Sequence, residues 1–268
     1  MEMLEREFGA YERECARRER SLQASGEFDA RFIPSDTGEE DEVFLTTWKY
    51  EDEMTPNYGV AIVRFLRRTF PEFSDISIGE QRLIVKNALG TYIILGVFRN
   101  NARLFPDNQK YHAMSYSTAY NLVCQDHFFD IPISPGYKSE LSRQMEHYWA
   151  RVKKTMRPLL ENANLSNTEY VCLYALLAWT FENDHIPVTV VACAENVKKR
   201  TIRAMSEHYR EMGRSDECST RIGTIMTIVH ALQESNELFQ EEYRMYSFMD
   251  VLNENCYMFK TMVINSSS

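Results

Sequence analysis

A long apolar helix is the feature that most limits what this chain can fold into. Ser77 and Glu80 form an S-x-x-E capping box, and apolar residues then occupy most positions around the helical turn from Gln81 to about Arg99. A helix that is apolar on most of its faces must be surrounded by other elements. The sequence therefore predicts a central helix covered by further layers.

Other segments also have helical periodicity. Between Pro56 and Pro71, apolar residues recur at helical spacing: Val60, Val63, Leu66 and Phe70. We expect further helices at 139–161, 167–181, 190–212 and 221–252. Ten Gly and eight Pro among 268 residues are too few for a turn-rich all-β chain. We therefore predict an all-α fold, with one small β-hairpin near Arg103–His112, where a Pro-Asp-Asn turn signal stands.

The first 42 residues differ in composition from the rest. Residues 1–22 are densely charged and predict a helix that is marginal unless it docks on other elements. Residues 35–42 are acidic and offer nothing to bury, which is typical of a solvated linker. We accordingly expect residues 1–42 to be a charged N-terminal appendage with an acidic linker, and residues 43–268 to form the compact domain.

Several function classes find no support in the sequence. The net charge of −9 repels nucleic-acid backbones, and the six cysteines form no pair of C-x2-C motifs that would bind zinc. The chain has no H-E-x-x-H, G-x-S-x-G or Gly-rich phosphate loop, and its six histidines are scattered. Its longest apolar runs are too short to span a membrane. We expect an intracellular protein that is not an enzyme and that needs neither a metal nor a cofactor.

The segment from Leu66 to Lys86, LRRTFPEFSDISIGEQRLIVK, resembles the signature of nuclear receptor ligand-binding domains. In that family an A-K-x-x-P-x-F stretch is followed by a Leu and then by D-Q-x-x-L-L-K. The matching positions here, at the same spacing, are Arg68, Pro71, Phe73, Ile76, Glu80-Gln81 and Ile84-Val85-Lys86. The stretch around Glu169 and the segment RIGTIMTIVHAL also resemble later helices of the family, so that the resemblance covers about residues 45–264.

This resemblance implies a three-layer antiparallel helical sandwich and a role in transcription regulation. The departures from the signature are most similar to the nematode-specific group of receptors. The resemblance implies a nuclear protein that also visits the cytoplasm. The zinc module through which the family binds DNA is absent from this sequence, so DNA contact is expected only through such a module.

A co-regulator groove is implied at the signature. Arg68 at the end of one helix and Lys86 within the next place two cations near a shared groove, where they could hold the carbonyl end of a partner helix. Gln81 and Val85 would form the groove floor. The alternative is a solvated pair of charges. Arg82 stands where the family has an apolar residue, which weakens the expected grip on a co-regulator helical peptide.

Near the C-terminus, one segment resembles the activation helix of the family. Its apolar positions are Met258, Phe259, Met262 and Val263. Thr261 replaces the acidic residue that clamps a co-activator helix in the family. A groove with cations and no opposing acid is expected to hold a co-activator weakly.

A cavity for a small lipophilic ligand is implied between two helices. The expected lining residues are Gly59, Val60, Val63, Ile93, Ile94 and Val97. Arg99 lies one residue from the position that binds a ligand acid in several members of the family. Because a desolvated Arg needs an anionic partner, a fatty acid is one candidate, and a salt bridge to Asp or Glu is the other.

The helix at 221–252 suggests dimerisation, because its apolar stripe is longer than one layer of core should need. The stripe runs through Ile222, Ile225, Met226, Val229, Leu232, Leu238, Phe239, Tyr243, Tyr246 and Met249. Four glutamates on the same helix would oppose a two-fold contact, so a heterodimer with another receptor competes with a homodimer. The alternative to a ligand-regulated domain is a ligand-independent interaction module with a filled core.

Overall fold

The computed structural model describes residues 1–28, 31–35, 43–106, 110–123, 127–130, 135–181, 186–248, 256–257 and 260. Within these residues the chain forms eight helices and four short strands. The helices are α1 (Glu2–Gln23), α2 (Trp48–Thr69), α3 (Pro71–Asp75), α4 (Ile78–Leu104), α5 (Pro135–Ala163), α6 (Asn167–Ala178), α7 (Val188–Glu211) and α8 (Cys218–Phe248). The strands are β1 (Arg31–Ile33), β2 (Val43–Leu45), β3 (Tyr111–Ala113) and β4 (Thr118–Asn121).

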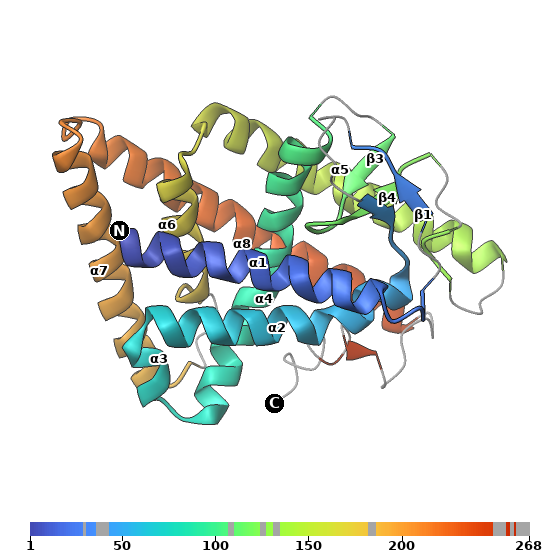
Figure 1. The fold of residues 1–268 in the computed structure, drawn as a ribbon, viewed down its shortest axis with the longest axis horizontal. Coiled ribbons are helices and arrows are strands. Elements are labelled where there is room, and N and C mark those ends of the chain that lie inside the picture. The colour runs from blue at the N-terminus through green and yellow to red at the C-terminus, as the bar shows by residue number, and fades with distance from the viewer. Residues whose placement is uncertain are drawn as a thin grey trace.

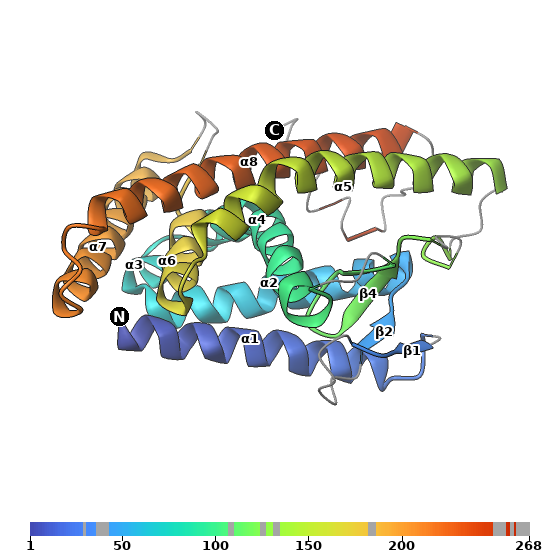
Figure 2. The ribbon, with the colours of Figure 1, turned by 90° about the horizontal axis from the view of Figure 1, so that it is seen from above.

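The helices form three layers around α4 (Figure 1). Seen from above, α1 and α2 make one outer layer, α4 and α6 lie in the middle, and α5 and α8 make the opposite layer (Figure 2). The helical sandwich predicted from the sequence is thus confirmed. The central position of α4 follows from its sequence, because buried residues lie on all its sides, among them Ile84, Leu89, Ile94 and Val97.

Side-chain caps set where two of the core helices begin. Ser77 accepts a hydrogen bond from the backbone N–H of Glu80, and the Glu80 carboxylate accepts one from the N–H of Ser77. Ser166 and Glu169 form the same reciprocal capping box at the start of α6. Both boxes were predicted from the S-x-x-E spacing, and both are confirmed.

Helix α2 begins earlier than the sequence predicts. Thr47 caps it, and the helix runs from Trp48 through Pro56, which lies inside it rather than at its start. The buried face of α2 includes Tyr58, Ala61, Ile62 and Phe65. Gly59, Val60 and Val63 lie outside this fully buried face, which matters for the ligand cavity described below.

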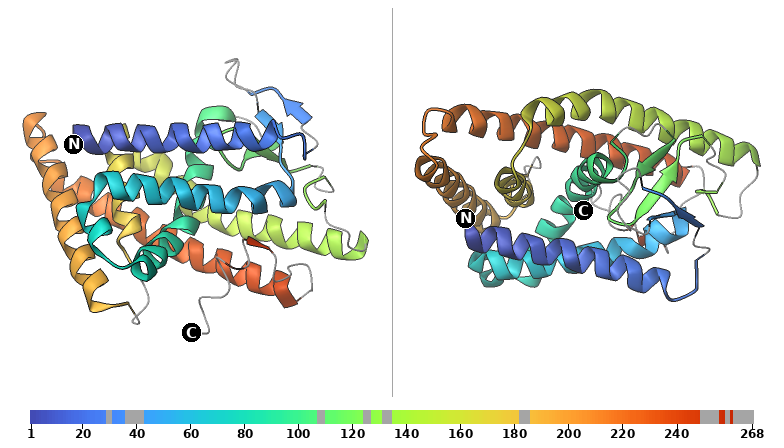
Figure 3. Two further views of the ribbon diagram at one scale, coloured as in Figure 1. Left: turned by 60° about the horizontal axis from the view of Figure 1, so that its bottom comes forward. Right: turned by 45° about the horizontal axis from the view of Figure 1, so that its top comes forward.

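Helix α1 differs from the charged appendage that the sequence predicts. It packs along α2, as both views of Figure 3 show, and it buries Leu4, Phe8, Tyr11, Cys15 and Glu19. Its exposed charged residues are Glu2, Arg6, Arg13, Arg17 and Arg20. Docking thus supplies the stability that its polar composition alone cannot provide. The domain limits at residues 42 and 43 stay a prediction.

The β structure is larger than the single hairpin predicted. Strands β3 and β4 form an antiparallel hairpin, but it lies at 111–121 rather than near Arg103–His112, because α4 continues to Leu104. Strand β2 pairs with β4 in parallel and with β1 antiparallel, which gives the sheet order β1-β2-β4-β3. The two added strands have three residues each, which is too short for a periodicity signal.

Candidate functional site

The predicted co-regulator groove lies where the end of α2 meets the start of α4. Gln81 is 8% exposed and is held by two hydrogen bonds. Its Oε1 accepts from Arg67 at 2.9 Å, and its Nε2 donates to the carbonyl of Ile76 at 3.1 Å. Gln81 therefore joins α2 to the turn before α4, and it fixes the floor of this surface.

The charged and apolar residues of the groove are exposed to different extents. The Arg68 side chain is largely exposed and comes within 4.0 Å of Glu7 on α1. Val85 and Lys86 are half-buried. The space where a Cβ of Gly59 would stand is 3.9 Å from Cγ1 of Val85, so a glycine on α2 faces a valine on α4.

Three residues predicted to line the ligand cavity lie toward this groove instead. Val60 is 41% exposed, and Gly59 and Val63 are half-buried. None of the three lines either of the two small internal cavities beside Ile93. The expectation differs from the structure because neighbouring residues, among them Tyr58 and Ile62, form the buried face of α2.

The cavity residues predicted on α4 lie in the core. Ile94 and Val97 are fully buried, and Ile93 lines two small internal cavities. One of these, of about 30 Å³, is enclosed mainly by aromatic residues of α2, α5 and α8, among them Trp48, Tyr148, Trp149 and Tyr243. A space of this size holds little more than a water molecule.

Arg99 contacts protein groups rather than an open cavity. Its Nη1 lies 3.1 Å from Glu12, and its Nη2 donates to Asn167 at 3.1 Å. The guanidinium also lies 5.3 Å from the ring centre of Phe8 and 5.2 Å from that of Tyr170. The salt bridge, one of the two alternatives drawn from the sequence, is the one that forms. Burial raises the pKa of Glu12, although Arg99 opposes the shift.

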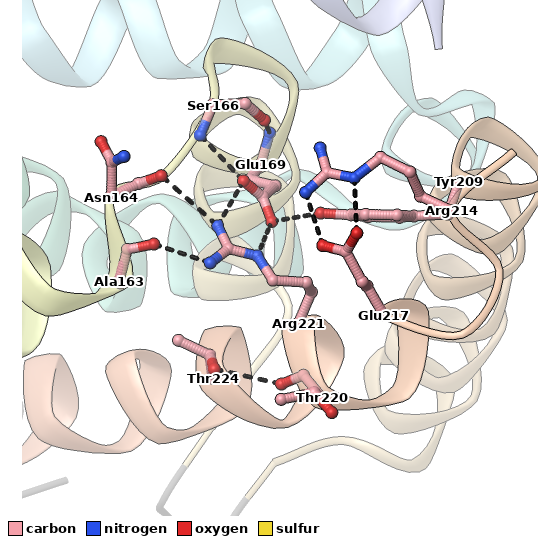
Figure 4. A network of polar contacts seen from close by, with 10 residues as sticks. All are labelled: Ala163, Asn164, Ser166, Glu169, Tyr209, Arg214, Glu217, Thr220, Arg221 and Thr224. Atoms are coloured by element: carbon pink, nitrogen blue, oxygen red, sulfur yellow. Dashed lines mark hydrogen bonds and ion pairs between the residues drawn. The ribbon is translucent and has the colours of Figure 1, made fainter. Parts of the chain in front are cut away.

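A dense ion-pair network joins α6 to α7 and α8 (Figure 4). Arg221 donates to both oxygens of Glu169 at 2.6 Å, and its Nη1 donates to the carbonyl of Ala163 at 2.7 Å. Tyr209 donates to the same carboxylate at 2.5 Å. Burial by itself would raise the pKa of Glu169, but the donors from Arg221, Tyr209 and Ser166 lower it to about 2. The Glu169 carboxylate is therefore charged throughout the physiological pH range.

Two other buried carboxylates have no cation beside them among the described residues. Glu19 accepts from Tyr58 and from the backbone and side chain of Ser117. Glu51 accepts from the hydroxyls of Thr46 at 2.6 Å and Thr118 at 3.1 Å. Burial raises the pKa of both, that of Glu51 to about 7, despite these donors.

Close to these acids, the C-terminal segment is held on α2. One oxygen of Asp52 accepts from Sγ of Cys256 at 2.9 Å, and the other accepts from the backbone N–H of Tyr257 at 3.1 Å. The predicted activation-helix residues Met258, Phe259, Met262 and Val263, together with Thr261, lie outside the described residues. Sequence reasoning missed Asp52, because a lone carboxylate on a helix gives no motif.

Most of the apolar stripe of α8 is buried within the domain itself. Ile225, Val229, Leu232, Phe239 and Tyr243 are buried, because α8 packs against four other helices. Met226 stays 38% exposed. The sequence overestimated the free apolar surface because it could not show how many neighbours α8 has.

No cluster of three or more His, Cys, Asp or Glu in the described part of the chain could hold a metal ion. Among the helices of that part, none has a stretch long and apolar enough to cross a membrane.

Comparison with known proteins gives one match. A family described as the ligand-binding domain of nuclear hormone receptor matches residues 53–249, which is most of the chain. A search of curated proteins found no match. The matched range contains the capping boxes, the groove and the Glu169–Arg221 pair.

Proposed function

The chain belongs to the nuclear hormone receptor ligand-binding domain family, and we propose that it regulates transcription by recruiting helical co-regulator peptides to the groove between α2 and α4. The family comprises ligand-regulated domains of transcription factors that are not enzymes. A nuclear location follows from the same membership, and we extend the proposal to the cytoplasm as a second compartment. The similarity to the nematode-specific group is likewise our proposal.

The observation that carries this proposal is the apolar surface that α2 and α4 leave partly exposed side by side. Val60, Val63 and Val85 leave apolar surface partly exposed on two adjacent helices, and Gly59 leaves room above Val85. Arg68 and Lys86 add positive charge beside that surface. An amphipathic helix binds to such a groove through its apolar face, and cations can pair with its carbonyl end.

The position of the C-terminal segment supports the same proposal. Asp52 holds Cys256 and Tyr257 against α2, the helix that also provides one wall of the groove. Asp52 thus accepts a hydrogen bond from the backbone of Tyr257, in a turn that the N–H of Lys260 closes by donating to the carbonyl of Cys256. We propose that Met258, Phe259, Met262 and Val263 form an activation helix there, with Thr261 in place of an acidic clamp.

The direct test is titration of a fluorescent Leu-rich helical peptide by fluorescence anisotropy. We expect Arg68→Glu and Lys86→Glu each to weaken binding by about tenfold, which corresponds to about 1.4 kcal/mol. Thr261→Glu should strengthen binding by restoring an opposing acid. Arg203→Glu, an exposed charge reversal on α7, is the control for net charge and should leave the affinity unchanged.

Unchanged affinity in both groove variants would contradict the proposal, as would an equal loss in Arg203→Glu. Thr261→Glu could bind no better than the parent protein while the groove variants lose affinity. That result would support peptide binding at the groove and contradict the proposed docking of the activation helix.

The closed internal cavity favours a second candidate function. At about 30 Å³ it does not accommodate a lipophilic ligand without repacking, which fits a ligand-independent interaction module with a filled core. Native mass spectrometry of the purified protein separates the candidates. A co-purifying lipid, such as a fatty acid, supports a ligand-regulated domain, and a mass equal to that of the bare chain supports the filled module.

We also propose self-association or pairing with another receptor through α8. Met226 offers exposed apolar surface, while Glu234, Glu237 and Glu241 are exposed and repel a symmetry-related copy. Light scattering at micromolar concentration should show a homodimer that tightens as salt is added. A monomer at every salt concentration excludes the homodimer and leaves the heterodimer.

A further inference from the structure

A cavity of about 540 Å³ lies away from the internal aromatic space. Residues from the end of α4, strand β3, the last turns of α5 and the start of α6 enclose it. Its lining includes Phe98, Ala102, Tyr111, His112, Lys153 and Arg157. No residue of α2 or α8 contributes to this lining, so the cavity is separate from the space between α2, α5 and α8.

One side of the cavity is cationic. Lys153 is half-buried and forms no ion pair with any described residue. Arg157, one helical turn further along α5, has a side chain that is 64% exposed and pairs at 2.6 Å with the exposed Glu161, which also lines the cavity and offsets the charge of Arg157. Lys153 thus lies deeper than Arg157, and its charge has no counterion among the described residues.

His112 adds a second polar group without a partner. Its side chain is 3% exposed, and Nε2 has no hydrogen-bond partner among the described residues. The ring packs against Trp149 with centroids 4.9 Å apart, which holds its orientation. Buried polar atoms are nearly always paired in folded proteins, so Nε2 offers a position at which a water molecule or a polar group of a ligand can bind.

Burial has the same electrostatic effect on both residues. It lowers the pKa of His112, with a further contribution from Lys153, and it lowers the pKa of Lys153, with a further contribution from Arg157. Each shift reflects the cost of positive charge in this environment. A bound anion would offset that cost, because it would supply the opposite charge that the described residues do not.

The rest of the lining is mixed. Phe98, Leu122, Leu160 and Tyr170 form an apolar part together with the edge of Pro106, while Asn101 and Asn164 are polar. The volume falls within the roughly 300–1,000 Å³ typical of small-molecule sites. Cations at one side and apolar side chains at the other match a molecule with an anionic head and a hydrocarbon tail.

We propose that this cavity is a ligand site for a long-chain carboxylate, with its head group at Lys153 and Arg157 and its tail against Phe98 and Leu160. A singly charged head suits a site where one lysine lacks a counterion. Polyphosphates need more cations than this wall provides, and the chain's net charge of −9 disfavours them. The proposal concerns ligand binding alone and does not depend on the co-regulator groove.

The test is calorimetric titration of the full chain with dodecanoate. Dodecanol, which lacks the charge, and butyrate, which lacks the tail, are the ligand controls. We expect Lys153→Met to weaken dodecanoate binding by about tenfold or more, because a charge-assisted contact is lost. Lys154→Met removes the same charge from the adjacent, exposed position and should leave the affinity unchanged.

Ala102→Trp provides a second variant that does not remove charge. Ala102 is exposed on α4, so a larger side chain there should leave the fold intact while it fills the cavity. We expect it to abolish binding without lowering the melting temperature. A diazirine-bearing dodecanoate should label peptides within 98–106 or 153–165.

Three results would overturn the proposal. Dodecanol binding as tightly as dodecanoate would show that the cations do not recognise a head group. Equal affinity in the parent protein, Lys153→Met and Ala102→Trp would place the ligand elsewhere. Labelling confined to α2 or α8 would assign it to the internal space.

Discussion

Buried glutamates in two halves of the molecule have opposite electrostatic surroundings. In the half formed by α6, α7 and the start of α8, Glu169 is paired in a bidentate manner with Arg221. In the half that contains the sheet, Glu19 and Glu51 accept hydrogen bonds from neutral groups. The two halves lie at opposite sides of the view in Figure 1.

This difference separates a fixed part of the domain from a part that responds to protonation. A charge held by a cation and two further donors keeps one state across the physiological pH range. A buried carboxyl with a pKa near 7 changes its charge within that range. Asp52, which holds the C-terminal segment, is the next residue after Glu51, so the responsive part is also where the proposed activation helix is attached.

The largest effect is expected from Glu169→Gln. The substitution leaves Arg221 without its carboxylate, and we expect the free energy of unfolding at pH 7 to fall by about 4 kcal/mol. Because the folded pKa is about 2 against an ordinary 4.5, this contribution is complete above about pH 4.5 and disappears as pH falls toward 2. Urea denaturation measures both.

Glu217→Gln is the matched control in the same network. Glu217 pairs with Arg214, but both side chains are exposed by more than two fifths, so the loss should be much smaller than that of Glu169→Gln. Losses of equal size in the two variants would mean that burial does not distinguish Glu169.

Glu51→Gln is expected to have the opposite sign. The folded pKa of Glu51 is raised from 4.5 to about 7, so its protonated form stabilises the fold below about pH 4.5, and that stability is lost as pH rises through 7. At pH 8 the variant should be more stable than the parent protein by about 3 kcal/mol. Unfolding curves at pH 5, 6, 7 and 8 should diverge with rising pH. Parallel pH profiles would show that Glu51 stays charged or stays neutral throughout.

Arg99→Met tests an intermediate case. Glu12 is partly buried and forms an ion pair with Arg99, whose guanidinium also lies near Phe8 and Tyr170. We expect a loss of about 1 kcal/mol in the free energy of unfolding, because the pair is still about one quarter exposed. A loss as large as that of Glu169→Gln would mean that the Arg99–Glu12 pair stabilises the fold as strongly as the pair in the fixed half.

The sequence predicted the parts of this molecule that are encoded locally. The S-x-x-E spacing located the starts of α4 and α6, and the signature between Leu66 and Lys86 spans the end of α2 and the start of α4. Pro56 misled the prediction of where α2 begins, because a proline inside a helix and a proline at its start look alike in sequence. Gly59, Val60 and Val63 were assigned to the cavity, although other residues form the fully buried face of α2.

The other features depend on contacts between distant segments. Glu19 meets Ser117 and Asp52 meets Cys256 only in the folded chain, so no spacing rule reveals either contact. Nothing in the sequence distinguishes Lys153 from the other lysines. Only the fold places it in the same cavity as His112 of β3. Burial without a counterion is a property of the fold and has no local sequence signal.

Amide hydrogen exchange at pH 5.5 and pH 8.0, corrected for intrinsic rates, tests the central contrast most directly. We expect protection factors in β4 and in the first turns of α2 to fall by about tenfold as pH rises, because Glu51 becomes charged where no cation compensates it. Protection in α6 and in the first turns of α8 should not change. A fall of the same size in both halves, or no fall around Glu51, would contradict the division into a fixed and a responsive half.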